Sequence, residues 1–167
     1  MSKSKIVGIM ALIAIAIVLA GDVVAGEKGK VVAREVFYAT TYHTLKVPDV
    51  EGHTNRLLEA KSIYFNEKFG PAVGVLTQLQ DVIKGAGTLE GYNHYTYPDG
   101  STISVKWKGE SKGGGLSLSG VATAEGTWTF IKGTGKYEGI QGRGTWKSYV
   151  LAPGQWYSDS EGEYTLP

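Results

Sequence analysis

Few side chains in this sequence have the types and spacing that catalysis requires. The three histidines, His43, His53 and His94, lie far apart, and none has a carboxylate at a metal-ligand spacing, so we expect no metal site. His53 follows Gly52 near the start of a predicted strand. It is the best placed of the three to donate or accept a proton at a barrel mouth, because histidine titrates near neutral pH. The alternative is a histidine that only hydrogen-bonds a turn.

Asn93 and Tyr95 are polar residues that we expect to face the interior. The segment Tyr97–Ser101, with Pro98 and Gly100 inside it, is typical of a type I turn followed by a left-handed residue. If Tyr97 pairs with Ser101, then Tyr95 and Asn93 share one face of the hairpin with Ile103 and Val105. Both side chains are therefore candidate ligand-binding groups in an apolar cavity.

Other catalytic classes lack their motifs. The chain has no cysteine, which excludes thiolate zinc sites, disulfides and a cysteine nucleophile. No G-x-S-x-G elbow occurs, and Ser117 and Ser119 have the alternation of strand residues. The glycine-rich segment 133–144 lies between two predicted strands and not before a helix, so it indicates a barrel corner, with Tyr137 and Ile140 as an apolar plug, rather than a phosphate loop. We expect no cofactor.

The elements that must position these residues are predicted to be β-strands. Tyr, Trp, Thr, Val and Ile crowd into short segments between glycines, and helical periodicity is nearly absent. We therefore expect an all-β fold, a single closed antiparallel β-barrel of about eight strands. The predicted strands span Val31–Val47, Leu57–Phe65, Val73–Leu79, Thr88–Tyr97, Thr102–Lys108, Leu116–Ala124, Thr127–Lys132, Thr145–Leu151 and, as a short last strand, Glu163–Leu166.

The N-terminal segment has the layout of a secretory signal peptide. Lys3 and Lys5 precede an apolar run from Ile6 to Ala20, and Asp22 and a small-residue stretch ending in Ala25 follow it. The run is shorter than the roughly 20 apolar residues that span a bilayer. We therefore predict cleavage after Ala25, with cleavage after Ala20 as the alternative, and a protein that is secreted or periplasmic.

The predicted domain organisation is residues 1–25 as signal peptide and residues 26–167 as one barrel domain. The 17 Lys and Arg residues nearly balance the 16 Asp and Glu residues, and they are scattered. A nucleic-acid partner therefore lacks its electrostatic signature. Without a cysteine for lipid attachment, we expect no stable membrane anchor after cleavage of the signal peptide.

Several turns resemble those of the allene oxide cyclase-like barrel family, in its secreted bacterial branch. The resemblance covers roughly Gly52 to Tyr164 and implies a closed antiparallel barrel. The glycine corner at Gly133–Tyr137 is also similar to the corner of dirigent proteins, which share this barrel. The other segments that carry the resemblance are Lys84–Thr88, Tyr97–Ser101 and Gly126–Trp128.

The resemblance implies a cavity that shapes a reactive apolar molecule. Plant members of the family cyclise a fatty-acid epoxide, held by a glutamate and asparagines of the cavity, and dirigent proteins steer the coupling of bound substrates. Asn66, within Phe65–Phe69, has a similar local context, whereas the surroundings of Glu35 do not match the family's motif. Because both families assemble as trimers, the resemblance also leaves a homo-oligomer open.

Three hypotheses for function follow. The leading one is an exported barrel that binds a small apolar molecule, with Asn66, Asn93, Tyr95 and His53 as candidate binding residues. Whether the protein is an enzyme stays open: the second hypothesis, a cyclase or isomerase of a hydrophobic substrate, requires a buried acid or base among Glu35, Glu59 and His53. The third is a structural or interaction module that uses the segment Lys108–Gly115 or the tail from Gln155.

Overall fold

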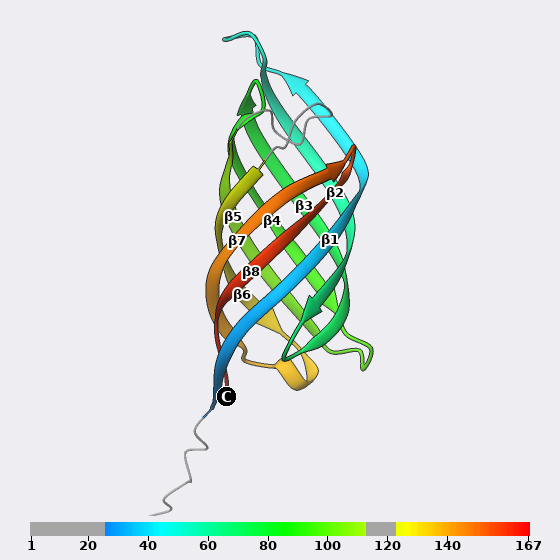
Figure 1. Cartoon of the computed structure of the whole chain (residues 1–167), viewed down its shortest axis with the longest axis vertical. Helices are drawn as coiled ribbons and strands as arrows, with labels where there is room; N and C mark the ends of the chain where they lie inside the picture. Colours follow the sequence, from blue (N-terminus) through cyan, green and yellow to red (C-terminus); the bar gives the residue numbers. More distant parts are fainter. Residues whose placement is uncertain (1–25, 113–122) are drawn as a thin grey trace, which may run out of the picture.

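The chain forms a closed barrel in which each strand is antiparallel to its neighbours in the sequence. The computed structural model describes residues 26–112 and 123–167. The sheet is closed by the pairing of the first strand with the last (Figure 1). The elements are β1 (Glu27–Lys46), β2 (His53–Asn66), β3 (Gly70–Ile83), β4 (Ala86–Thr96), β5 (Thr102–Lys112), β6 (Thr123–Gly133), the short 3₁₀ helix η1 (Gly135–Tyr137), β7 (Gln141–Ala152) and β8 (Gln155–Leu166).

This architecture confirms the predicted all-β antiparallel barrel, but the limits of some strands differ from the prediction. β2 begins at His53, four residues before the predicted start. The predicted tail from Gln155 is wrong, because β8 runs from Gln155 to Leu166 and pairs with both β1 and β7. Its serines, acids and Gly162 have low β propensity, so closure of the barrel, and not local preference, holds this segment in a strand.

Some predicted features lie outside the described residues. These are the signal peptide at residues 1–25, Ser117 and Ser119, and most of the predicted strand Leu116–Ala124. Of that strand, the last two residues are described and belong to β6. The predicted exposed loop from Lys108 is instead the end of β5 as far as Lys112.

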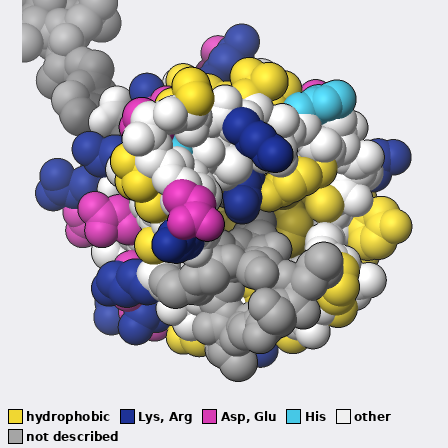
Figure 2. All heavy atoms as spheres, turned by 90° about the horizontal axis from the view of Figure 1, so that it is seen from above, with side chains coloured by type: hydrophobic (Ala, Val, Ile, Leu, Met, Phe, Trp, Pro, Cys, Tyr) yellow, Lys and Arg dark blue, Asp and Glu magenta, His cyan; other side chains and the backbone are white. Residues whose placement is uncertain are grey.

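The order of the strands gives the barrel two distinct ends. The lower end in Figure 1 carries Glu27, Leu166, η1 and the turns that join β2 to β3 and β4 to β5. The upper end carries the turns that join β1 to β2, β3 to β4 and β7 to β8. Figure 2 looks down on this end, where both hydrophobic and charged side chains are visible at the rim. In the described part of the chain, no helix has the length and apolarity needed to cross a membrane.

A cluster of aromatic side chains fills the lower end. The ring of Phe69 lies 5.2 Å from that of Tyr137 and 4.8 Å from that of Tyr164, measured between centroids, and Tyr97 lies 4.6 Å from Tyr137. Ile140 packs into the same core. The predicted apolar plug under the glycine-rich corner is therefore confirmed, and the interior is filled by side chains at this end.

The turn between β4 and β5 has the predicted register. The amide of Tyr97 donates to the carbonyl of Ser101 at 2.9 Å, and Gly100 has a φ of 82°. Asn93 pairs with Val105 and Tyr95 with Ile103. The inward direction predicted for Asn93 and Tyr95 is therefore confirmed.

Glycines opposite aromatic residues keep the middle of the barrel open. Gly91 on β4 pairs with Trp107 on β5, and a Cβ atom on Gly91 would lie 2.6 Å from Cζ2 of the indole. Gly144 on β7 likewise pairs with Trp128 on β6, and a Cβ atom on Gly144 would lie 2.6 Å from Cζ2 of that indole. Each indole therefore lies close to the backbone of the neighbouring strand, where a side chain would displace it.

We predict that Gly91→Ala destabilises the fold by roughly 1–3 kcal/mol, because the new methyl group overlaps the Trp107 ring and the carbonyl oxygen of Thr77. Urea denaturation measures the change. The control is Glu90→Ala, which alters an exposed side chain on the same strand and should change stability by less than about 0.5 kcal/mol. Equal stability of the two variants would mean that the indole does not rest on the glycine.

Candidate functional site

A cavity lies inside the barrel above the aromatic cluster of the lower end. All eight strands contribute to its lining, and it reaches Ser111 and Thr123, which border the segment 113–122. Its volume is about 80 Å³. This is several times what one water molecule needs, roughly 10–15 Å³. The cavity can therefore hold a small organic molecule.

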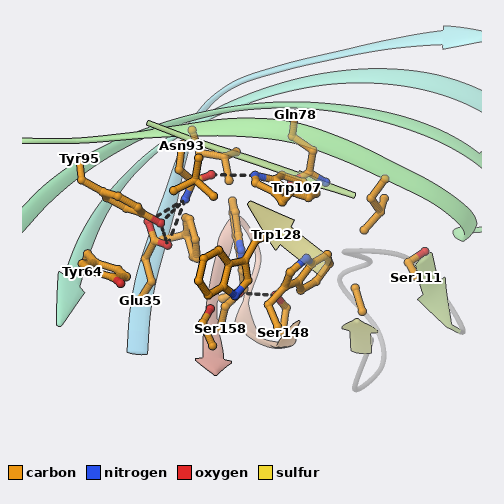
Figure 3. Close-up of a pocket in the computed structure, with 18 of the residues that line it drawn as sticks. Glu35, Tyr64, Gln78, Asn93, Tyr95, Trp107, Ser111, Trp128, Ser148 and Ser158 are labelled. Atoms are coloured by element: carbon orange, nitrogen blue, oxygen red, sulfur yellow. Dashed lines mark hydrogen bonds between the residues drawn. The ribbon is translucent and has the colours of Figure 1, made fainter. Parts of the chain in front are cut away.

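The wall of the cavity is largely aromatic. Phe37 and Trp156 stack with ring centroids 4.8 Å apart, and Trp107 and Trp146 meet edge to face at 5.4 Å. Trp128 lines the opposite side of the lumen in Figure 3. Such a wall favours an apolar ligand with flat faces, whose burial supplies the binding energy.

A buried carboxyl group lies at one end of this cavity. Glu35 on β1 is only 5% exposed. Its oxygens accept hydrogen bonds from Ser62 Oγ at 2.5 Å, from Tyr95 Oη at 2.6 Å and from Asn93 Nδ2 at 3.0 Å (Figure 3). Asn93 is itself oriented by the indole of Trp107, whose Nε1 donates to the amide oxygen at 2.8 Å. These contacts fix the position of the carboxyl group.

Burial changes the acid–base properties of this cluster. Desolvation raises the pKa of Glu35 to about 7, against the lowering effect of the hydrogen bonds from Ser62, Tyr95 and Asn93. Desolvation also raises the pKa values of Tyr64 and Tyr95 above the ordinary tyrosine value, so both stay protonated and able to donate. Near neutral pH, Glu35 therefore exchanges readily between its two protonation states, as a general acid or base requires.

The pairing of four strands explains why these residues meet. The alternation along β1 places Glu35 inside between Ala33 and Phe37, opposite Tyr64 of β2. On β3, Gly74 pairs with both Ser62 and Tyr95. A Cβ atom there would collide with Ser62 Oγ and lie 3.2 Å from Glu35 Oε1. The missing side chain at Gly74 thus leaves the space in which the carboxyl group and its donors meet.

Of the candidate residues named from the sequence, Asn93 and Tyr95 belong to this cluster and line the cavity. Asn66 is also buried on β2, but it does not line the cavity. Its Nδ2 donates to Tyr64 Oη at 3.0 Å, and its Oδ1 accepts from the amides of Lys68 and Phe69 at 2.8 Å each. Asn66 therefore orders the turn after β2 and contacts the site only through Tyr64.

His53 lies away from the carboxyl cluster, at the upper end of the barrel. Its Nδ1 lies 2.6 Å from Asp49 Oδ1, and its Nε2 lies 2.6 Å from Asp81 Oδ1. These two contacts raise the pKa of His53 and connect the turn after β1 to β3. Among the described residues, no cluster of three or more His, Cys, Asp or Glu side chains is arranged to hold a metal ion.

From the sequence, Glu35 was considered only as one of three residues that could supply the buried acid or base of an enzyme. Its position between Ala33 and Phe37, at inward positions of an alternating strand, was the available signal that it faces the interior. Ser62, Tyr64 and Trp107 were not singled out as partners, because their proximity to Glu35 depends on strand pairing across the barrel.

We predict that Glu35→Gln changes how stability depends on pH. The folded protein holds the Glu35 proton more tightly than the unfolded chain, whose pKa is about 4.5, so this contribution is fully present below that value. The stability that the folded protein gains by holding this proton is lost as the pH rises through about 7. Between these limits the wild type should lose roughly 3 kcal/mol of stability relative to Glu35→Gln.

Urea denaturation from about pH 4 to about pH 9 measures this difference. Surface carboxylates that titrate in the same range are common to both proteins, so their effect cancels. The control is Glu59→Gln on β2, where the side chain is exposed and no comparable difference should arise. A constant difference between wild type and Glu35→Gln across this range would show that Glu35 titrates like a solvated carboxylate.

The assignment of this site depends on its geometry. No protein-family model matches the chain, and no curated protein matches it.

Proposed function

We propose that this protein is an exported barrel, secreted or periplasmic, that binds a small and mainly apolar molecule in its cavity. The observation that carries the proposal is the aromatic-lined cavity with a buried, hydrogen-bonded carboxyl group at one end. A barrel that served only as a scaffold gains nothing from this arrangement, because a buried carboxyl group costs stability. Apolar walls with a few oriented polar groups are the usual composition of a small-molecule site.

Native mass spectrometry of the chain from residue 26, purified from its own host, tests this proposal. We expect a stoichiometric adduct of one small molecule. The adduct should be lost in Ala124→Phe, which fills the cavity from β6, and kept in Thr127→Phe, which adds the same ring to an exposed position on that strand. A bare protein mass, unchanged after incubation with mixed lipids, would contradict the proposal and favour an interaction module.

A second candidate function is a cyclase or isomerase, and Glu35 is the specific observation that favours it. A carboxyl group with a pKa of about 7 can take a proton from one atom of a bound molecule and return it to another. Ser62, Asn93 and Tyr95 stabilise its ionised form through their hydrogen bonds. Such an isomerisation needs no co-reactant, since the bound molecule loses one proton to Glu35 and gains one proton from it.

We predict a solvent-isotope signature if Glu35 transfers protons in this way. The bound molecule, recovered after incubation of the protein in D₂O, should carry deuterium on carbon, because the Glu35 proton exchanges with solvent. Glu35→Gln should slow this incorporation by about 10²-fold or more. Mass spectrometry of the extracted ligand measures it, and Glu59→Gln is the control. Equal incorporation in both variants would exclude Glu35 as the group that transfers the proton.

A further inference from the structure

Two buried N–H donors in the cavity wall have no hydrogen-bond acceptor among the described residues. They are Nε2 of Gln80 on β3 and Nε1 of Trp146 on β7, and we call them the donor pair. Both residues line the cavity, and Gln80 is only 4% exposed. By contrast, the indole N–H of Trp107 donates to Asn93 Oδ1 and that of Trp128 to the carbonyl of Thr145. Since buried donors are nearly always paired, the donor pair requires an explanation.

The donor pair lies on one register row of the sheet. Gln80 pairs with Leu89, Leu89 with Gly109, Gly109 with Gly126, and Gly126 with Trp146. A Cβ atom on Gly109 would lie 2.6 Å from Cζ2 of Trp146, so the indole reaches from β7 across β6 to β5. The glycines thus let the indole extend to β5, whose neighbour β4 pairs with the strand that carries Gln80.

We propose that the donor pair binds oxygen acceptors of a neutral ligand, such as ketone, ester or ether oxygens on an apolar, ring-containing molecule. This inference rests on the proposed binding function and names the class of ligand. An amide N–H and an indole N–H are uncharged donors that match neutral oxygens. Flat rings of the same molecule pack against the indoles of the wall.

The charges around the cavity disfavour an anionic ligand. Among the described residues that line the cavity there is no Lys, Arg or His, and Glu35 is an acid. Burying a carboxylate there would forfeit its hydration without a cationic partner. Arg56 pairs with Gln80 on the neighbouring strand but is not part of the lining. Its Nε donates to Thr54 Oγ1 at 2.9 Å.

The spacing of the polar groups also limits the ligand. Asn93, beside Glu35, pairs with Leu76 of β3, and Gln80 lies four residues further along that strand. At about 3.3 Å per residue, this separates the two polar regions by roughly 13 Å along β3. A ligand that contacts both regions is therefore elongated, with an acceptor oxygen near Gln80 and a second polar group at the carboxyl cluster.

Three probes of similar size separate the possible ligand classes: acetonaphthone, a neutral ketone; naphthoate, an anion; and ethylnaphthalene, which has no acceptor. Their affinities are measured by quenching of tryptophan fluorescence and confirmed by calorimetry. We expect acetonaphthone to bind about three- to ten-fold more tightly than ethylnaphthalene, the value of a neutral hydrogen bond, and naphthoate to bind most weakly.

Matched variants assign that preference to the donor pair. Trp146→Phe and Gln80→Met each remove a donor and keep most of the side-chain volume, and together they should abolish the preference for the ketone. The indole N–H of Trp128 already donates to the carbonyl of Thr145. Because Trp128 lines the cavity, Trp128→Phe weakens the binding of the ketone and of ethylnaphthalene alike, and this control should keep the ratio of the two affinities. In the absence of ligand, Gln80→Met should melt about 3 °C higher than wild type, because it removes a buried unpaired donor.

The outcomes distinguish this inference from the proposed function. If none of the three probes binds, both the binding function and the inference fail. If the ketone and ethylnaphthalene bind equally, or if Trp128→Phe and Trp146→Phe lose the preference alike, the cavity binds ligands but the donor pair does not recognise them. Tighter binding of naphthoate would also overturn the inference and would point to Arg56 as the recognition group. A lower melting temperature for Gln80→Met would show that its amide serves the fold instead.

Discussion

The pairing of β1 with β8 is the constraint on which the rest of the structure depends, because it converts a twisted sheet into a barrel without edges. Once the sheet closes, every second residue of each strand must point into a space of fixed size. That space accommodates Glu35 as well as Phe37, although a carboxyl group and an aromatic ring have opposite preferences for water. Closure therefore determines both where the cavity lies and which polar groups it must contain.

The carboxyl cluster shows how the barrel tolerates a buried acid. Removing Glu35 from water opposes its ionisation, and the donors from Ser62, Asn93 and Tyr95 act in the opposite direction. Desolvation is the larger effect and the hydrogen bonds offset part of it, so the pKa of Glu35 rises only to about 7. The offset requires hydrogen-bond donors from β2 and β4 at the correct distance from Glu35. Gly74 on the intervening β3 has no side chain and so leaves the space in which these groups meet.

The fold could be predicted further than the site. Alternation, glycine-bounded strands and the turn at Tyr97–Ser101 were sufficient for an antiparallel barrel and for the inward direction of Asn93 and Tyr95, because these signals are local. β8 was largely missed since its polar sequence forms a strand only through its two neighbours. The carboxyl cluster combines residues from three strands, and no local pattern reports which inward residues of different strands come into contact.

The first and last residues of the closed sheet, Glu27 and Leu166, lie at the same end of the barrel. Glu27 pairs with Leu166 at the lower end of the barrel, behind the aromatic cluster formed by Phe69, Tyr137 and Tyr164. The cavity extends in the other direction, to Ser111 at the upper end. A linker joined directly before Glu27 or after Leu166 thus emerges on the side remote from the upper end. The barrel can accordingly be immobilised on a sensor surface, or fused to a reporter protein, through either of these two positions with its upper end facing the sample.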